Sequence, residues 1–299
     1  MNLRTVSFLI VCTISFSLSA NPLPKTNGQQ DGLLILAYGM SMVSKRTGET
    51  IHIRSEEVAE MAKELNQTIP TEVAFGLADP EPIQDAVNHL QMRGVKRAVV
   101  VPVFVTSHSA IIGNSKYILG LQKQLAATSK RTALGQIKST IKFQFASAMD
   151  TDPMISKILF DKALESSKNT KGTTLILIAH GPENKTDNDR WMQDMQIHAE
   201  YLRNTGRFKN VLYTTLRSNS PKVDEKKIQE LRAMVEKADA EGDAVLVPIA
   251  LSIHGIERPI KNYLQGLNYA FGSPMMPHPN IQKWVVDNYR KANVRFSEN

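Results

Sequence analysis

The sequence contains a single cysteine, Cys12, which lies inside an apolar segment near the N-terminus. If that segment is removed, the mature chain has no thiol, so disulfides are excluded and any metal site must use histidine, carboxylate or amide ligands. No apolar run of the chain is followed by a GxGxxG or a GxxxxGK(S/T) motif. Neither a dinucleotide site nor an ATP site is therefore indicated, and no nucleotide is expected as a cofactor.

Blocks of basic residues are also missing, although 36 Lys and Arg residues against 29 Asp and Glu residues give a formal net charge of +7. Such a charge favours an anionic partner, which can be a nucleic acid, a membrane surface or a polycarboxylate ligand. The basic residues are spread singly along predicted helices and are not interleaved with aromatic residues. Nucleic acid is therefore not expected as the partner.

A hydrophobic run long enough to span a membrane is absent from residues 1–20, because the apolar stretch that begins at Val6 is shorter than the roughly 20 residues needed. An early Arg4 and small residues up to Ala20 are typical of a secretory signal peptide, which we favour over a membrane anchor. Residues 21–31 form a flexible lead-in. We expect an exported, periplasmic protein with no membrane span after the signal is removed.

From Gly32 onward, apolar runs of strand length alternate with amphipathic stretches of helix length, as in parallel βαβ units. Ser55 can cap a helix with acidic residues in its first turn, and Gly94 follows a helix that begins near a proline. The pattern predicts helices over 55–67 and 81–94, and strands over 32–37, 71–76, 97–105, 140–146, 173–179, 209–215 and 243–251.

The chain also repeats itself. Three pairs of segments match without gaps and follow one another in the same order: "LLILAYG" (33–39) with "LILIAHG" (175–181), 98–120 with 244–266, and 145–153 with 271–279. This order predicts an α/β protein of two similar domains, 32–168 and 169–299, each a parallel sheet flanked by helices and related by internal duplication. Matched segments should occupy equivalent places, with a cleft between the domains.

Two histidines follow predicted strands of the second half, His180 and His254. Ligands of open parallel sheets bind at the carboxyl ends of strands, so we expect both imidazoles to reach one ion at about 2.0 to 2.2 Å. Neutral imidazoles suit Co, Ni, Fe and Zn ions, and a two-histidine site leaves coordination positions open. Glu257 could ligate the metal, accept a proton, or simply be an acidic residue at the start of a helix next to Pro259.

These strand-end histidines occur together with the segment "VAFGLADPEPIQDAVNHLQMRGVKRAVVVPVF" (73–104). The combination resembles the class II tetrapyrrole chelatases, and within them the CbiX and SirB type sirohydrochlorin cobalt or iron chelatases, whose long forms are fused duplicates. The resemblance covers about residues 32–290. It implies a lyase that inserts a divalent metal ion, Co²⁺, Fe²⁺ or Ni²⁺, into a planar sirohydrochlorin-like macrocycle without ATP. The first family histidine falls on His180 and the second most nearly on His254, which would receive the metal and help to take the pyrrole protons.

The chain departs from the family pattern in three respects. Tyr38 stands where the first half should carry a histidine, so that half is expected to have a degenerate site with His108 as a helper. A phenolic metal ligand is the other interpretation of Tyr38, although neutral tyrosine coordinates weakly. The histidines after the Val-Pro strands come about two residues earlier than in the family, and a secretory signal is unusual for enzymes that are mostly cytoplasmic.

The substrate implied by the resemblance is an anionic tetrapyrrole with many carboxylates. Four basic residues near strand ends of the second half could bind these carboxylates, or could be solvated surface charges: Arg190, Arg217, Arg258 and Lys261. The protein would act as a monomer or a homodimer.

Two other functions are compatible with the sequence. An exported carrier would bind a metal ion or a tetrapyrrole without catalysis, and an exported protein of two α/β domains fits that function. An interaction protein built on a chelatase fold that has lost its activity is the third interpretation, and Tyr38 favours it. The histidine pair favours the chelatase, because a carrier for carboxylates does not need it.

Overall fold

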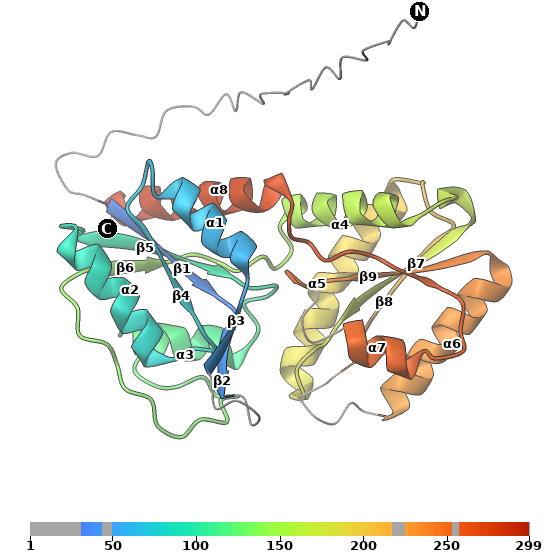
Figure 1. Ribbon diagram of the computed structural model, residues 1–299, viewed down its shortest axis with the longest axis horizontal. Helices are drawn as coiled ribbons and strands as arrows, with labels where there is room; N and C mark the ends of the chain where they lie inside the picture. Colours follow the sequence, from blue (N-terminus) through green and yellow to red (C-terminus); the bar gives the residue numbers. More distant parts are fainter. Residues whose placement is uncertain (1–30, 44–49, 217–224, 253–256, 299) are drawn as a thin grey trace, which may run out of the picture.

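The computed structural model describes residues 31–43, 50–216, 225–252 and 257–298 (Figure 1). The expected signal peptide lies outside these residues, as do His254 and Arg217. Two parallel four-stranded sheets have the orders β4-β1-β5-β6 and β10-β9-β7-β8. The strands are β1 (Asp31–Ala37), β2 (Gly39–Val43), β3 (Thr50–Arg54), β4 (Thr71–Phe75), β5 (Arg97–Val103), β6 (Lys142–Phe145), β7 (Thr173–Ala179), β8 (Asn210–Thr215), β9 (Asp243–Pro248) and β10 (Ala270–Phe271).

The helices flank these sheets and connect their parallel strands. They are α1 (Glu56–Leu65), α2 (Pro80–Met92), α3 (Ala110–Ile118), α4 (Pro153–Ser166), α5 (Lys185–Asn204), α6 (Glu225–Glu241), α7 (Glu257–Tyr263) and α8 (Pro279–Glu298), with a single 3₁₀ turn over Thr170–Gly172. The expected cap of α1 is present, because Ser55 Oγ accepts a hydrogen bond from the amide of Val58 at 3.3 Å.

The internal duplication is visible in the pairing of the strands. Leu36 of β1 lies opposite Pro102 of β5, and Ile178 of β7 lies opposite Pro248 of β9. These are the residues that the ungapped repeat aligns, and the two sheets place their strands in the same order. The predicted fold class, two similar α/β domains with parallel sheets, is therefore confirmed.

An antiparallel hairpin distinguishes the first half from the second. Strands β2 and β3 pair from Gly39 with Arg54 to Val43 with Thr50, in the place where the second half has only the loop 180–184 between β7 and α5. This hairpin is not among the strands predicted from the sequence. Its strands are only five residues long, but apolar and polar residues alternate along Thr50–Arg54, which is a strand signal that the sequence did offer.

Successive side chains of β1 and of β7 point to opposite faces of their sheets and so enter three separate apolar cores. Residues facing one side of β1 and of β7 enter a single core shared by both halves: Leu33, Ile35, Leu175 and Leu177. Their neighbours face the other side and enter a separate core in each half: Leu34 and Leu36, and Ile176 and Ile178. Both strands are buried on both faces, which explains why they read as continuous apolar runs.

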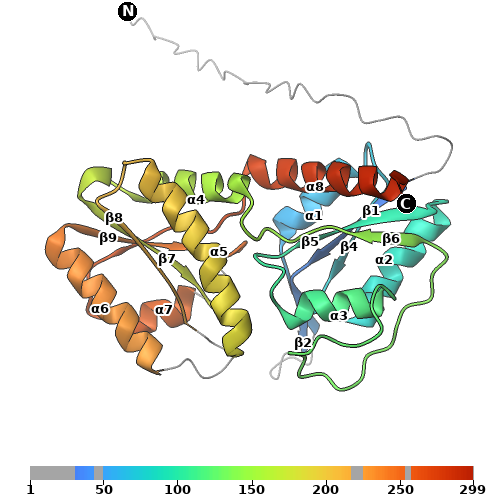
Figure 2. The ribbon, with the colours of Figure 1, turned by 180° about the vertical axis from the view of Figure 1, so that it is seen from behind.

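Two helices pack on the sheet of the opposite half. Helix α4 follows the first sheet in sequence but packs on β9 and α5, whereas α8 packs on β5 and β6. Figure 1 and Figure 2 show the result from both sides, with α8 along the lobe of the first sheet and α4 along the lobe of the second. Each packed unit therefore contains a helix supplied by the other half.

A buried ion pair fixes α8 to the first sheet. Arg97 donates hydrogen bonds from Nε and Nη2 to the two carboxylate oxygens of Asp31, each at 2.8 Å, and Asn293 Nδ2 of α8 donates to Asp31 Oδ2 at 3.1 Å. Burial is the main cause that raises the pKa of the nearby Tyr289 phenol to about 12; the Asp31 carboxylate adds to the rise and Arg97 opposes it. Tyr289 is therefore held as a neutral phenol.

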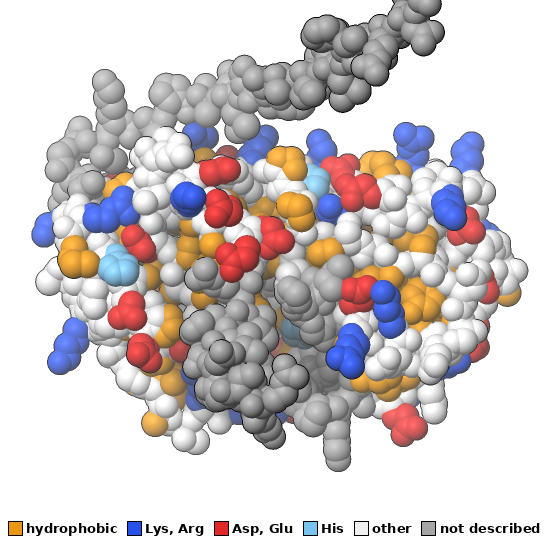
Figure 3. All heavy atoms as spheres, viewed as in Figure 1, with side chains coloured by type: hydrophobic (Ala, Val, Ile, Leu, Met, Phe, Trp, Pro, Cys, Tyr) orange, Lys and Arg blue, Asp and Glu red, His pale blue; other side chains and the backbone are white. Residues whose placement is uncertain are grey.

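The surface of one face is uneven in charge (Figure 3). Acidic side chains gather over α1, which carries Glu56, Glu57, Glu60 and Glu64, whereas Lys and Arg side chains are scattered. Within the described part of the chain, no helix combines the length and the apolar character needed to cross a bilayer.

The Tyr289 phenol predicts a loss of stability at alkaline pH. The pKa is about 12 in the folded protein against an ordinary 10.0, so the contribution is complete below pH 10 and is lost as the pH rises toward 12. The difference corresponds to about 2 to 3 kcal/mol in the free energy of unfolding. Between pH 9 and pH 11, urea denaturation should show a smaller decrease in the free energy of unfolding for the Tyr289→Phe protein than for the wild type. Tyr201→Phe, at an exposed tyrosine of α5, is the control and should follow the wild type.

Candidate active site

His180 stands at the carboxyl end of β7, and the residue after it explains the His-Gly pair. Gly181 has a φ of +63°, and a Cβ atom there would lie 2.5 Å from Cβ of Thr215 and 2.8 Å from Oδ1 of Asn188. Only glycine allows this left-handed turn so close to β8. The turn ends the strand and leaves the imidazole of His180 at the edge of the sheet where ligands of such folds bind.

The His180 imidazole is in contact with an indole and remains accessible to solvent. Its ring centroid lies 5.0 Å from that of Trp191 at an interplanar angle of 42°, and Nδ1 lies 3.2 Å from the carbonyl oxygen of Gly181. The protein atoms that surround the ring lower the pKa of His180, and the Gly181 carbonyl partly opposes this. The accessible ring surface limits the lowering, but its direction favours a neutral imidazole with a lone pair for a metal ion or a proton.

Trp191 links His180 to the first half of the chain. Its Nε1 donates a hydrogen bond of 2.8 Å to the carbonyl oxygen of His108, which follows β5. Trp191, Asp194, Met195 and His198 are spaced along one face of α5. Figure 1 and Figure 2 both show α5 at the junction between the two lobes. The strand-end histidine of the second half and the backbone of His108 in the first half therefore both contact one indole.

The other predicted site residues are distributed as follows. His254 and Arg217 lie outside the described residues, so the expected approach of His180 and His254 stays a prediction. Glu257 begins α7, where its Oε1 lies 2.5 Å from Nζ of Lys261. Arg190 on α5 and Arg258 on α7 are exposed. The roles predicted for these side chains in metal or substrate binding stay predictions.

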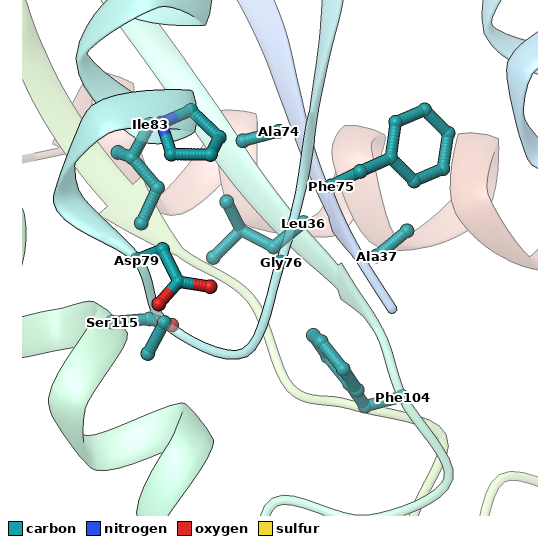
Figure 4. A pocket seen from close by; sticks show the side chains of 11 residues that line it. Leu36, Ala37, Ala74, Phe75, Gly76, Asp79, Ile83, Phe104 and Ser115 are labelled. Atoms are coloured by element: carbon teal, nitrogen blue, oxygen red, sulfur yellow. The ribbon is translucent and has the colours of Figure 1, made fainter. Parts of the chain in front are cut away.

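The equivalent strand end of the first half has a different chemistry. Tyr38 follows β1 and is half-buried, and a small pocket lies at the ends of β1 and β4 (Figure 4). Its lining contains one acidic side chain, Asp79, which accepts a hydrogen bond of 2.8 Å from Arg131. The lining residues, all within the described ranges, include no histidine: Leu36, Ala37, Ala74, Phe75, Gly76, Ala78, Asp79, Pro82, Ile83, Phe104 and Ser115.

Sequence reasoning missed the residues that line the junction between the halves. Trp191 and Asp194 of α5 lie there with Asp150, which follows β6. Burial is the main cause that raises the pKa of Asp194, and Asp150 adds to it, whereas the hydroxyl of Thr106 and the imidazole of His108 lower it. The one sequence signal was that Asp194 and His198 share a helix face with apolar Trp191 and Met195, which is unusual for a solvated acid.

Comparison with known proteins finds one matching family model and several solved structures of similar fold. Residues 48–166 match the family model of CbiX. The structure of SirB from Bacillus subtilis with Fe³⁺ aligns with 91% of this chain and 98% of its own, at a TM-score of 0.64 and 16% identity. The sirohydrochlorin chelatase SirB of Bacillus subtilis subspecies spizizenii in complex with cobalt aligns with 88% and 95%, at a TM-score of 0.58 and 13% identity.

A third similar structure is that of a multi-domain protein from Deinococcus radiodurans with structural similarity to chelatases. It aligns with 88% of this chain and 55% of its own, at a TM-score of 0.54 and 18% identity. No curated protein sequence matches the chain. The chelatase-like fold predicted from the sequence is confirmed by these structures.

Gly181→Ala should destabilise the protein by about 1 to 3 kcal/mol more than Gly206→Ala, because it adds a steric clash to a strained backbone. Gly206 has nearly the same φ, +62°, but a Cβ atom there would meet nothing within 4 Å. The two variants thus share the cost of a left-handed alanine, and only Gly181 has the contact with Thr215. Thermal or urea denaturation of both variants measures the difference. Equal losses would show that the close approach to β8 does not constrain the His180 turn.

Proposed function

We propose that this chain, whose residues 48–166 match the CbiX family model and whose fold is similar to that of SirB, is a class II chelatase that inserts a divalent metal ion into a sirohydrochlorin-type tetrapyrrole without ATP. The observation that carries the proposal is the solvent-accessible imidazole of His180, which lies against Trp191 at the carboxyl edge of the second sheet. Metal insertion needs a group with a free lone pair, and this side chain provides one beside an aromatic surface.

The chemistry requires two kinds of lone-pair donor. Insertion of one M²⁺ ion releases the two pyrrole N–H protons of the macrocycle, so the ion needs a ligand that lets it go and the protons need bases. His180 can do either, because the protein around the ring lowers its pKa and so favours the unprotonated imidazole. His254, the partner that the repeat predicts, would supply the second nitrogen. Trp191, in contact with the His180 ring, offers an apolar surface for a planar macrocycle.

Basic side chains close to this edge could bind the substrate's carboxylates. Arg190 lies in the second turn of α5, which follows β7, and Arg258 lies in the first turn of α7, which follows β9. Both are exposed and both belong to helices that begin at the carboxyl edge of the second sheet. Lys261 is held by Glu257 and would need to exchange that partner for a substrate carboxylate.

The metal is proposed to be Co²⁺, Fe²⁺ or Ni²⁺. A site with imidazole ligands suits these ions. The two SirB structures contain iron and cobalt, which supports the first two. An anaerobic assay that offers each ion in turn with sirohydrochlorin, followed by the absorbance of the macrocycle, decides among them.

His180→Ala should reduce metal insertion by at least about 100-fold, because a methyl group can neither coordinate an ion nor accept a proton. Tyr38→Phe should keep most of the activity. The two positions are equivalent in the repeat, so damage common to any altered strand end would appear in both. His89→Ala, at an exposed histidine of α2, controls for the loss of an imidazole elsewhere. The measurement is the initial rate of sirohydrochlorin conversion with saturating Co²⁺ or Fe²⁺.

Activity that survives His180→Ala but is lost in Tyr38→Phe would move the working site to the first half. A wild-type protein that binds sirohydrochlorin and Co²⁺ but never combines them would instead be a carrier.

Residues 1–20 further lead us to propose export to the periplasm. Cell fractionation tests this proposal. A processed chain in the periplasmic fraction supports it, and a full-length cytoplasmic chain contradicts it.

A further inference from the structure

We propose that His108, Asp150 and Asp194 bind a divalent transition-metal ion at the junction between the two halves, at a site separate from His180. One ligand atom from each of the three side chains lies within 4.8 Å of the other two. His108 Nε2 and Asp194 Oδ2 are 3.9 Å apart. Ligand atoms that lie about 2.1 Å from one ion are roughly 3 to 4 Å from each other. His108 and Asp194 already meet this spacing, so only the Asp150 side chain needs a small movement.

The three ligands come from three different elements and from both halves. His108 follows β5 and Asp150 follows β6, so both belong to the first half, whereas Asp194 belongs to α5 of the second half. The site therefore exists only when the halves are packed together. An ion bound there would connect them directly.

Neighbouring groups already orient both carboxylates. Thr106 Oγ1 donates to Asp194 Oδ2 at 3.0 Å. The amide and the hydroxyl of Ser107 donate to the two oxygens of Asp150, at 2.5 and 2.8 Å. Buried His198 fixes the backbone of the same loop, because its Nε2 lies 2.8 Å from the carbonyl oxygen of Asp150. Hydrogen-bonded second partners of this kind are what metal-binding carboxylates commonly have.

The charges at the junction favour a cation. The side chain of Asp194 is only 14% exposed, and both Asp194 and Asp150 line one cavity together with Thr106 and Trp191. Within the described part of the chain, no Lys or Arg forms an ion pair with either carboxylate, and the partner of Asp194 is the 34% exposed His108. Two ionised carboxylates brought together from separate halves repel each other, and a cation bound between them would relieve that repulsion.

The donor set indicates which cation this is. One imidazole and two carboxylates suit first-row divalent ions such as Co²⁺, Fe²⁺, Ni²⁺ or Zn²⁺, whereas Mg²⁺ and Ca²⁺ prefer oxygen ligands alone. His180 does not belong to this cluster, and Trp191 contacts both places, since its indole lies against the His180 ring and hydrogen-bonds to the backbone of His108. The inference does not rest on the proposed chelatase reaction, because it concerns binding of the ion alone.

The experiment uses the His180→Ala/His254→Ala protein, from which the proposed insertion site has been removed. Titration with Co²⁺ alone, followed by calorimetry and by the visible absorption of the bound ion, should show one remaining site per chain. Adding Asp194→Asn should weaken this binding at least about tenfold, since the amide keeps the shape of the side chain but removes its charge. Glu200→Gln, on the solvent face of the same helix, is the matched control and should leave the affinity unchanged.

Thermal unfolding gives a second readout. Saturating Co²⁺ should raise the unfolding midpoint of the background protein and of the Glu200→Gln variant, but not that of Asp194→Asn. Midpoints in excess chelator show whether the variants fold, and Asp150→Asn and His108→Ala should weaken binding as Asp194→Asn does. Unchanged Co²⁺ affinity in all three ligand variants, or no binding to the background protein, would overturn the proposal. Neither result bears on whether His180 supports metal insertion.

Discussion

The burial of one face of each sheet in a common apolar core is the constraint on which the rest of the molecule depends. Leu33 and Ile35 of β1 pack in the same cluster as Leu175 and Leu177 of β7, so the two sheets cannot move apart without exposing apolar surface to water. This packing places α5 against the loops that follow β5 and β6. The arrangement of Trp191, His108 and Asp194 is a consequence of it, because none of these contacts exists within one half.

Much of the fold could be predicted from the sequence because its determinants are local or repeated. Buried parallel strands are continuous apolar runs, and the ungapped repeat fixed which runs are equivalent; Leu36 opposite Pro102 and Ile178 opposite Pro248 show that the register was conserved as well. The exchange of α4 and α8 could not be predicted in this way. The apolar face of a helix specifies that it must be covered, but does not specify which of two similar sheets will cover it.

For the candidate site too, the residues fixed by local sequence could be predicted, and those brought together by the packing of the halves could not. His180 could be found because a strand end in a parallel sheet is a place where ligands bind, and Gly181 explains why the chain can turn there. Trp191, Asp150 and Asp194 could not be found, since their proximity depends on how the halves pack and their separation in the sequence carries no information about it. The mixed apolar and ionisable face of α5 was a usable signal, because a carboxylate among buried residues needs a partner from elsewhere.

The exchanged helices also determine when each lobe can be completed. The surface of β5 and β6 that α8 covers is synthesised long before α8 itself, and the whole second half lies between them in the chain. The apolar surface of β5 and β6 therefore stays uncovered by α8 until nearly the entire polypeptide has been synthesised. Although each half repeats the strand order of the other, neither carries all of the helices that cover its own sheet, and a cut between the halves would remove one covering helix from each. The duplicated sheets thus share one apolar core and exchange one helix each.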